Sequence, residues 1–308
     1  MQPIAIERMS LLDGAAVAKY FAAGPAHPCI ITDAVTDWPA YGKWNFEFFS
    51  SNFYNAMGLA TLSFTQTSAG KTTKLGLFID HLDDPYFDLP GFWIGTDGKP
   101  AASAPDFDEA RVWSFLWNLF RKHPELRDDI APFPAAIPNL TASLPRDISE
   151  GLERLEGVDF FDLYISRKDT ITPLHTDFHH TIGCLVQFEG TKKVVLFAPG
   201  DYESPEGPDF DPENPDYQAY PAMLGRLAHS AVLEPGEMLI IPPDWWHYTR
   251  SQAHSMTLSH NFFTDRNLAA YLRGVRESIR NHPDRLRRFE RVQEYFQPPA
   301  EIALERDA

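Results

Sequence analysis

The sequence predicts a mainly β protein whose core is a jelly roll or barrel, with an N-terminal α/β region before it and helices after it. Three observations support this prediction. From about residue 155, short runs of β-branched and aromatic residues recur between turn signals with glycine or proline. Before that point helical and strand-like runs alternate, and after residue 265 the pattern is helical. The predicted parts are residues 1–150, 151–265 and 266–308.

The N-terminal region is predicted to contain both helices and strands. Residues 10–24 have the spacing of a short amphipathic helix, and the β-branched run CIITDAV is typical of a strand. Residues 61–67 and 73–80 are predicted to form a pair of strands, because Gly70 turns the chain between them.

Two further elements precede the predicted core. Residues 92–100 are expected to form a strand that ends in a turn, and residues 107–123 a helix with Phe115, Leu116 and Leu119 on one face. The core strands are then predicted in FFDLYIS, HTIGCLVQFEG, KKVVLFAPG, HSAVLEPGEMLIIP, WWHYTRS and SMTLSHNFF.

Residues 201–222 interrupt these strands. They are acidic and rich in proline, which predicts a long loop or lid. Such a loop is either solvated or in contact with a basic substrate.

Composition limits the function. The 308 residues carry a net charge of −16, so we expect no nucleic-acid partner, because phosphate backbones are bound mainly by clustered lysine and arginine. Cys29 and Cys184 form no CxxC pair and are expected to be buried free thiols. The N-terminus lacks the pattern of a signal peptide and no apolar run is long enough for a membrane span, so a cytoplasmic protein is expected.

A candidate metal site lies in the predicted core. His175 and Asp177 occur in TPLHTD, and residues i and i+2 of a strand project from one face. An HxD pair alone is common at surfaces, and a lone buried histidine is more often a core residue than a ligand. His247, at the end of the motif PPDWWH, supplies a third ligand from a distant strand. Two histidines and one carboxylate form the facial triad that suits non-haem iron(II) and leaves one face open.

The chain also offers a cation and neutral polar groups for a co-substrate. Lys192 begins the strand KKVVLF, and an inward lysine is costly to bury unless an anion pairs with it. The alternative is that Lys192 and Lys193 are both exposed where the strand begins. Thr172, Ser259 and Asn261 are predicted near the same volume, where they hold carboxylate oxygens or satisfy backbone groups. His179, His180 and Trp245 are candidates for the substrate mouth.

Residues 25–265 resemble the JmjC and cupin-like 2-oxoglutarate oxygenases. The resemblance rests on CIITDAVTDWPAYGKW, TPLHTD, QFEGTKKVVLF, NPDYQAYP and LEPGEMLIIPPDWWHYT followed by SMTLSHNFF. It implies a double-stranded β-helix, iron at His175, Asp177 and His247, and 2-oxoglutarate at Lys192. It also implies co-substrate contacts from Thr172 and Ser259.

The sequence departs from the family pattern in three places. In many members an asparagine follows HxD closely, and here that position is Thr181. The spacing from His175 to Lys192 is similar to that of the lysyl-hydroxylase branch and longer than that of the asparaginyl-hydroxylase branch. The tyrosine that usually contacts the co-substrate is not evident, although Phe92 and Trp93 fall in roughly that region.

The resemblance implies an Fe(II)- and 2-oxoglutarate-dependent dioxygenase that uses O2 to hydroxylate a side chain of a protein or peptide. Demethylation of an N-methyl group and hydroxylation of a small molecule are alternatives with the same chemistry. A cupin isomerase or a dioxygenase without 2-oxoglutarate is a third alternative, which would not need Lys192. A non-catalytic cupin-type binding module is a fourth. Under each of these alternatives, the C-terminal helices are a candidate surface for a homodimer.

Overall fold

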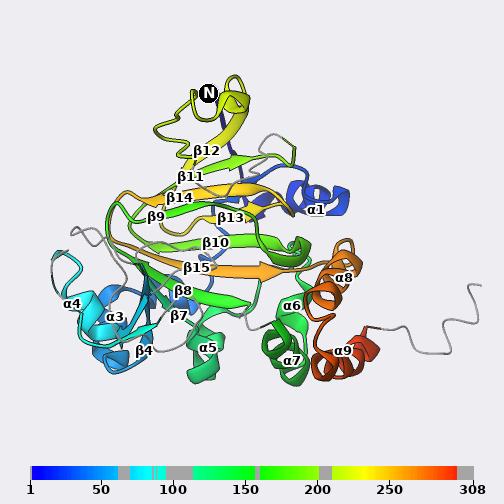
Figure 1. Ribbon diagram of the computed structural model, residues 1–308, viewed down its shortest axis with the longest axis horizontal. Coiled ribbons are helices and arrows are strands. Elements are labelled where there is room, and N and C mark those ends of the chain that lie inside the picture. Colours follow the sequence, from blue (N-terminus) through cyan, green and yellow to red (C-terminus); the bar gives the residue numbers. More distant parts are fainter. Residues whose placement is uncertain are drawn as a thin grey trace, which may run out of the picture.

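Two stacked β-sheets form the centre of the molecule, with helices around them (Figure 1). The computed structural model describes residues 2–61, 70–84, 87, 89–94, 114–156, 160–200 and 210–296. The ten-stranded sheet has the order β2-β3-β13-β10-β15-β8-β7-β4-β5-β6, and the five-stranded sheet has the order β1-β12-β11-β14-β9.

Eight consecutive strands form the core, four in each sheet. In the larger sheet β13, β10, β15 and β8 are antiparallel neighbours, and in the smaller sheet β12, β11, β14 and β9 are. This is a double-stranded β-helix, as predicted. The strands are β8 (Phe161–Ser166), β9 (Ile171–His175), β10 (Ile182–Glu189), β11 (Lys192–Phe197), β12 (Leu227–Leu233), β13 (Met238–Ile241), β14 (Trp246–Ser251) and β15 (Ser255–Phe262).

The N-terminal strands extend both sheets of this core. The first strand pairs in parallel with β12. The third pairs with β13, and the second pairs with the third at the edge of the larger sheet. Four later strands continue the larger sheet beyond β8. These strands are β1 (Gln2–Ala5), β2 (Glu7–Met9), β3 (Cys29–Ile31), β4 (Met57–Thr61), β5 (Gly70–Lys74), β6 (Phe92–Ile94) and β7 (Ser114–Trp117).

The predicted N-terminal helix is confirmed as α1 (Gly14–Ala23), which the Asp13 carboxylate caps by accepting from the Ala16 N–H. The predicted C-terminal helices are α8 (Leu268–Ser278) and α9 (Pro283–Tyr295). The remaining helices are α2 (Pro39–Lys43), α3 (Phe46–Phe53), α4 (Leu75–Asp80), α5 (Leu119–Lys122), α6 (Leu140–Ser143) and α7 (Arg146–Glu156), with 3-10 turns η1 (Leu11–Asp13), η2 (Pro124–Ile130), η3 (Phe178–His180) and η4 (Pro221–Met223).

Two predictions in the N-terminal region are wrong. Residues 75–80, expected as part of a strand, form α4, in which Leu75 and Phe78 are both buried one helical turn apart. Residues 114–117, expected as part of a helix, form β7 between β4 and β8, with Phe115 and Trp117 buried. A short apolar run that is buried on both sides has no periodicity by which strand and helix can be told apart. Residues 62–69 and 95–113, which belong to the other predicted elements, lie outside the described residues.

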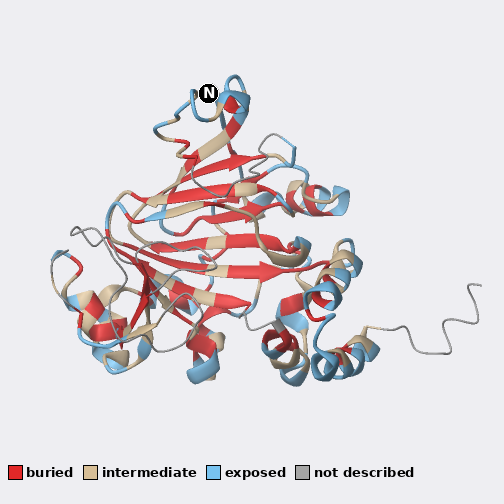
Figure 2. Ribbon diagram, in the orientation of Figure 1, coloured by how far each residue is buried: buried red, intermediate tan, exposed pale blue. Residues whose placement is uncertain are grey.

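The apolar residues form three clusters, and the buried positions follow the strands in Figure 2. The largest cluster lies between the larger sheet and its helices and includes Cys29 and Cys184, which are buried and free as predicted. A second cluster, with Val194, Leu196 and Trp245, fills part of the space between the sheets. A third covers the outer face of the smaller sheet. None of the described helices combines the length and the apolar character that crossing a membrane requires.

His260 is buried beside the largest apolar cluster and has a structural role. Its ring stacks on Phe161 at 3.7 Å between centroids, its Nδ1 donates to the Phe160 carbonyl, and its Nε2 accepts from the Asn139 amide. Burial lowers the pKa of His260 from 6.5 to about 3. The ring is therefore neutral in the folded protein over most of the acid range.

We expect the free energy of unfolding to fall as the pH falls below about 6.5. In the unfolded chain His260 binds a proton at that pH, whereas in the folded protein it binds one only near pH 3. Replacing His260 with Phe removes this term and keeps the ring stack. The variant should lose about 2 kcal/mol less of its free energy of unfolding between pH 7 and pH 5 than the parent. Urea unfolding at both pH values measures this. Equal losses in parent and variant would contradict the assignment.

Candidate metal centre

Three predicted ligands converge where β9 and β14 pair. His175 is the last residue of β9, and its register partner on β14 is His247. Their ring centroids lie 4.0 Å apart. Asp177 lies two residues beyond the end of β9, but its backbone stays extended (φ −70°, ψ 161°), so its side chain points to the same side as His175. One ligand atom from each of the three residues lies within 4.8 Å of the others.

Both histidines present Nε2 to the centre. The Nδ1 of His175 donates to the Pro173 carbonyl at 2.8 Å, and the Nδ1 of His247 donates to the Trp245 carbonyl at 3.1 Å. This tautomer leaves each Nε2 lone pair for a metal. Burial, together with the neighbouring His247, lowers the pKa of His175 to about 4, so the imidazole is neutral as a ligand must be. The donor set therefore fits a divalent ion of the iron(II) type.

The Asp177 carboxylate depends on a close approach to β10. Its Oδ1 lies 3.9 Å from the His247 Nε2, and its side chain accepts no hydrogen bond from the described residues. A Cβ atom added to Gly183 would lie 2.2 Å from the Asp177 Oδ2. Only glycine at position 183 leaves room for the carboxylate in this orientation.

Lys192 lies on the inner face of β11, deep between the sheets. It is 6% exposed and shares its face with Val194 and Leu196 of the second apolar cluster, whereas Lys193 is on the opposite, more exposed face. Its ammonium group makes no hydrogen bond or ion pair with the described residues. Burial lowers the pKa of Lys192 to about 8.

The register fixes the distance between Lys192 and the triad. Lys192 pairs with Ser251 of β14, and Leu196 pairs with His247. Four residues of a strand span roughly 13 Å. The four-carbon stem of a lysine and a small diacid together fill such a gap.

The other predicted co-substrate residues lie on the inner faces of neighbouring strands. Thr172 pairs with Thr249 of β14, and Ser259 lies opposite Asp162 of β8. The amide of Asn261 donates to the Thr181 hydroxyl at 3.2 Å, so one of its donors is already used.

The sequence analysis missed Tyr164, which lies on the inner face of β8 with Asp162. Burial, with the charges of Asp162 and Asp177, raises the pKa of Tyr164 well above its usual value. The alternation of polar and apolar residues in FFDLYIS could have indicated it. Phe92 and Trp93 are not near the centre. They lie on β6, at the far edge of the larger sheet, where Phe92 is 77% exposed.

A cavity of about 550 Å³ opens at Asp177. His179, His180 and Asp244 line it. The remaining lining residues lie at and just after the end of α8: Gly274, Glu277, Ser278, Arg280 and Asn281. Trp245, which we expected at the mouth, is 5% exposed and packs against His229 inside the second apolar cluster. Trp245 and Asp244 face opposite sides of the same turn. The indole ring of Trp245 points inward, and the carboxylate of Asp244 points outward.

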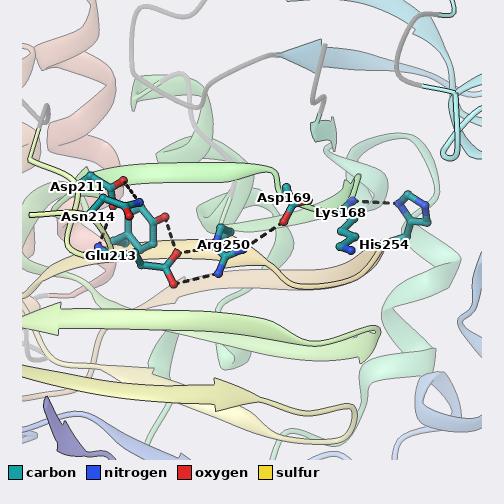
Figure 3. A network of polar contacts seen from close by, with 8 residues as sticks. Lys168, Asp169, Asp211, Glu213, Asn214, Arg250 and His254 are labelled. Carbon is teal, nitrogen blue, oxygen red and sulfur yellow. Dashed lines mark hydrogen bonds and ion pairs between the residues drawn. The ribbon is translucent and has the colours of Figure 1, made fainter. Parts of the chain in front are cut away.

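The acidic loop is held against the smaller sheet. Residues 201–209 lie outside the described residues, but Glu213 accepts from the Arg250 guanidinium at 2.5 and 3.1 Å and from the Tyr248 hydroxyl at 2.9 Å (Figure 3). Arg250 also donates to Asp169. The charge of Glu213 is therefore paired with Arg250 within the protein.

Comparison with known proteins agrees with this architecture. Residues 18–269 match the model of a cupin-like domain. The chain belongs to the cupin-like domain family. This cupin-like chain is 25% identical to Jumonji C domain-containing protein 5 of Drosophila melanogaster over 78% of its own length and 55% of that protein. It is 26% identical to lysine-specific demethylase JMJ30 of Arabidopsis thaliana over 76% of its length and 49% of that protein.

A third relative is aligned over a larger share of its own length. The bifunctional peptidase and (3S)-lysyl hydroxylase JMJD7 of Homo sapiens is 23% identical over 78% of each protein. The cupin-like chain thus spans about half the length of the first two relatives and most of the third. The resemblance inferred from the sequence motifs is confirmed.

Replacing Gly183 with Ala should displace the Asp177 carboxylate and weaken Co(II) binding at least tenfold, because the new methyl group would occupy the carboxylate's position. A Co(II) titration followed by visible absorption measures this. Gly42→Ala is the matched control, since a Cβ there meets nothing within 4 Å. Equal Co(II) affinities for the two variants would show that the close approach does not hold the carboxylate.

Proposed function

We propose that the protein is an Fe(II)- and 2-oxoglutarate-dependent dioxygenase that hydroxylates a side chain of a protein or peptide. One observation supports this most: a buried lysine without an anionic partner among the described residues lies on β11 four residues before the position that pairs with His247 of the His-Asp-His centre. A buried ammonium group without a partner is costly, and the distal carboxylate of 2-oxoglutarate would remove that cost.

The residues of the centre have distinct roles in this proposal. His175, Asp177 and His247 would hold Fe(II), which supplies the activation of O2 when it is bound. The carbonyls of Pro173 and Trp245 fix the two imidazoles in the tautomer that binds metal. Lys192 orients the co-substrate, with Thr172, Ser259 and Tyr164 as polar neighbours. Val194, Leu196 and Trp245 keep water from this part of the barrel.

The cavity at Asp177 is the proposed route for the substrate. No phenylalanine, tyrosine or tryptophan is among the described residues that line it. A pocket for a methylated cation is often lined by such rings. This favours hydroxylation over demethylation, although relatives with either activity in their names match the chain. A non-catalytic module would not need to keep all three ligands and the buried lysine.

Replacing Lys192 with Met should abolish 2-oxoglutarate binding and also stabilise the ligand-free protein by about 1 to 3 kcal/mol, because it removes an unpaired buried charge. Anaerobic titration of the Fe(II)-loaded protein with 2-oxoglutarate, followed by the weak visible charge-transfer band, measures binding. Urea unfolding measures stability. Lys193→Met is the control, since that side chain faces the other way. No band in the parent, or a band of equal affinity in the Lys192 variant, would refute the proposed function.

The affinity for 2-oxoglutarate should fall as the pH rises above about 8. The carboxylate binds the charged form of Lys192, and in the ligand-free protein this group loses its proton near pH 8. Binding above that pH must therefore take up a proton, so the Kd should rise up to tenfold per pH unit. Calorimetric titration of the metal-loaded protein from pH 7 to pH 9, in two buffers of different ionisation enthalpy, measures both the Kd and the proton uptake. A constant Kd to pH 9 would argue against this role of Lys192.

A further inference from the structure

His180 and Asp244 form a pair across the mouth of the candidate metal centre. The His180 Nδ1 donates to both carboxylate oxygens of Asp244, at 2.7 and 2.8 Å. His180 lies three residues after Asp177, and Asp244 lies three residues before His247. The pair therefore joins the loop that carries one ligand to the turn that carries another.

The backbone at this pair is strained. Among the described residues, four that are not glycine have a positive φ, and three of them are His179 (49°), His180 (57°) and Asp244 (65°). Strained residues persist only where their surroundings hold them, and they gather at functional sites. The pair itself is half-exposed, with side chains 50% and 49% exposed, and such pairs contribute little to stability. Stability alone does not account for this geometry.

The loop is also held from its other side. The carbonyl of His180 accepts from the Asn267 amide at 2.8 Å, just before α8 begins. A Cβ added to Gly274 of α8 would lie 2.7 Å from the His179 ring, so the helix packs directly on the loop. Asp177 is thus carried by a short segment that is fixed to α8 on one side and to the turn before His247 on the other.

We propose that His180 and Asp244 are positioning residues that set the separation between Asp177 and His247. This rests on the proposed function only in that the three ligands bind a metal. The pair touches none of the ligand atoms that face the metal, and it acts by holding their backbone segments. Removal of a group that hydrogen-bonds a metal ligand directly changes metal affinity about 10- to 100-fold. This pair acts through the backbone, so we expect an effect at the lower end of that range.

The test compares two aspartates in the same backbone conformation. Asp244→Gly removes the carboxylate and relieves the positive φ. Asp169→Gly does the same at a residue with φ 65° whose carboxylate accepts from Arg250, in the turn before β9. We expect Co(II) affinity to fall about tenfold in the Asp244 variant and to be unchanged in the Asp169 variant. The melting temperatures of the metal-free variants should be similar, which shows that both fold.

A conservative variant separates positioning from structure. Asp244→Asn tolerates a positive φ and keeps an oxygen that accepts from His180, so it should retain most of the Co(II) affinity and the parent's visible bands. Equal affinity of the Asp244→Gly variant and the parent, or an equal loss in the two glycine variants, would overturn the inference and leave the proposed function standing. Failure of the parent to bind Co(II) would overturn both.

Discussion

The metal centre depends on one feature of the β9–β14 pairing. Thr172 pairs with Thr249 and His175 pairs with His247. Between these two pairs β9 advances by three residues and β14 by only two, so β9 contains a bulge. This bulge includes Pro173, which lacks an N–H for the ladder and is tolerated because β9 is at the edge of its sheet. The bulge brings His175 opposite His247, and the carbonyl of Pro173 then accepts from the His175 ring. A regular strand would present the neighbouring side chain to the centre instead.

The interior between the two sheets is divided into an apolar and a polar part. Val194 and Leu196 of β11 pack with Leu239 and Ile241 of β13, whereas β8 and β15 contribute hydroxyl, amide and carboxyl groups. Lys192 stands where these parts meet. Its buried charge lowers the stability of the ligand-free protein until an anion binds to it. Selection for stability alone would therefore replace this lysine. The barrel therefore gives up stability at the position where the proposed co-substrate binds.

The strands after residue 155 were predictable because short β-branched and aromatic runs recur there between turn signals with glycine or proline. The three candidate ligands were predictable because HxD, a weak pattern alone, is followed about 70 residues later by PPDWWH within the predicted core. Tyr164 was not recognised because a tyrosine within an apolar strand resembles a core residue until its neighbours are known. Trp245 was misplaced because the sequence does not show which side of a turn each residue faces. The fold of residues 75–80 and 114–117 depends on partners elsewhere in the chain, and local pattern carries no information about them.

The C-terminal helices have a role that their sequence did not indicate. We interpreted them as a candidate surface for assembly, yet α8 lines the cavity and contacts the loop that carries Asp177. The pairing of β9 with β14 places the two histidines opposite each other, and the carbonyls of Pro173 and Trp245 orient their rings. The carboxylate, in contrast, lies on a loop beyond the sheet, where no ladder of hydrogen bonds fixes it. Within the barrel the carboxylate lies close to Gly183 of β10, and the loop that carries it is contacted through His179 and His180 by α8, by Asn267 and by Asp244.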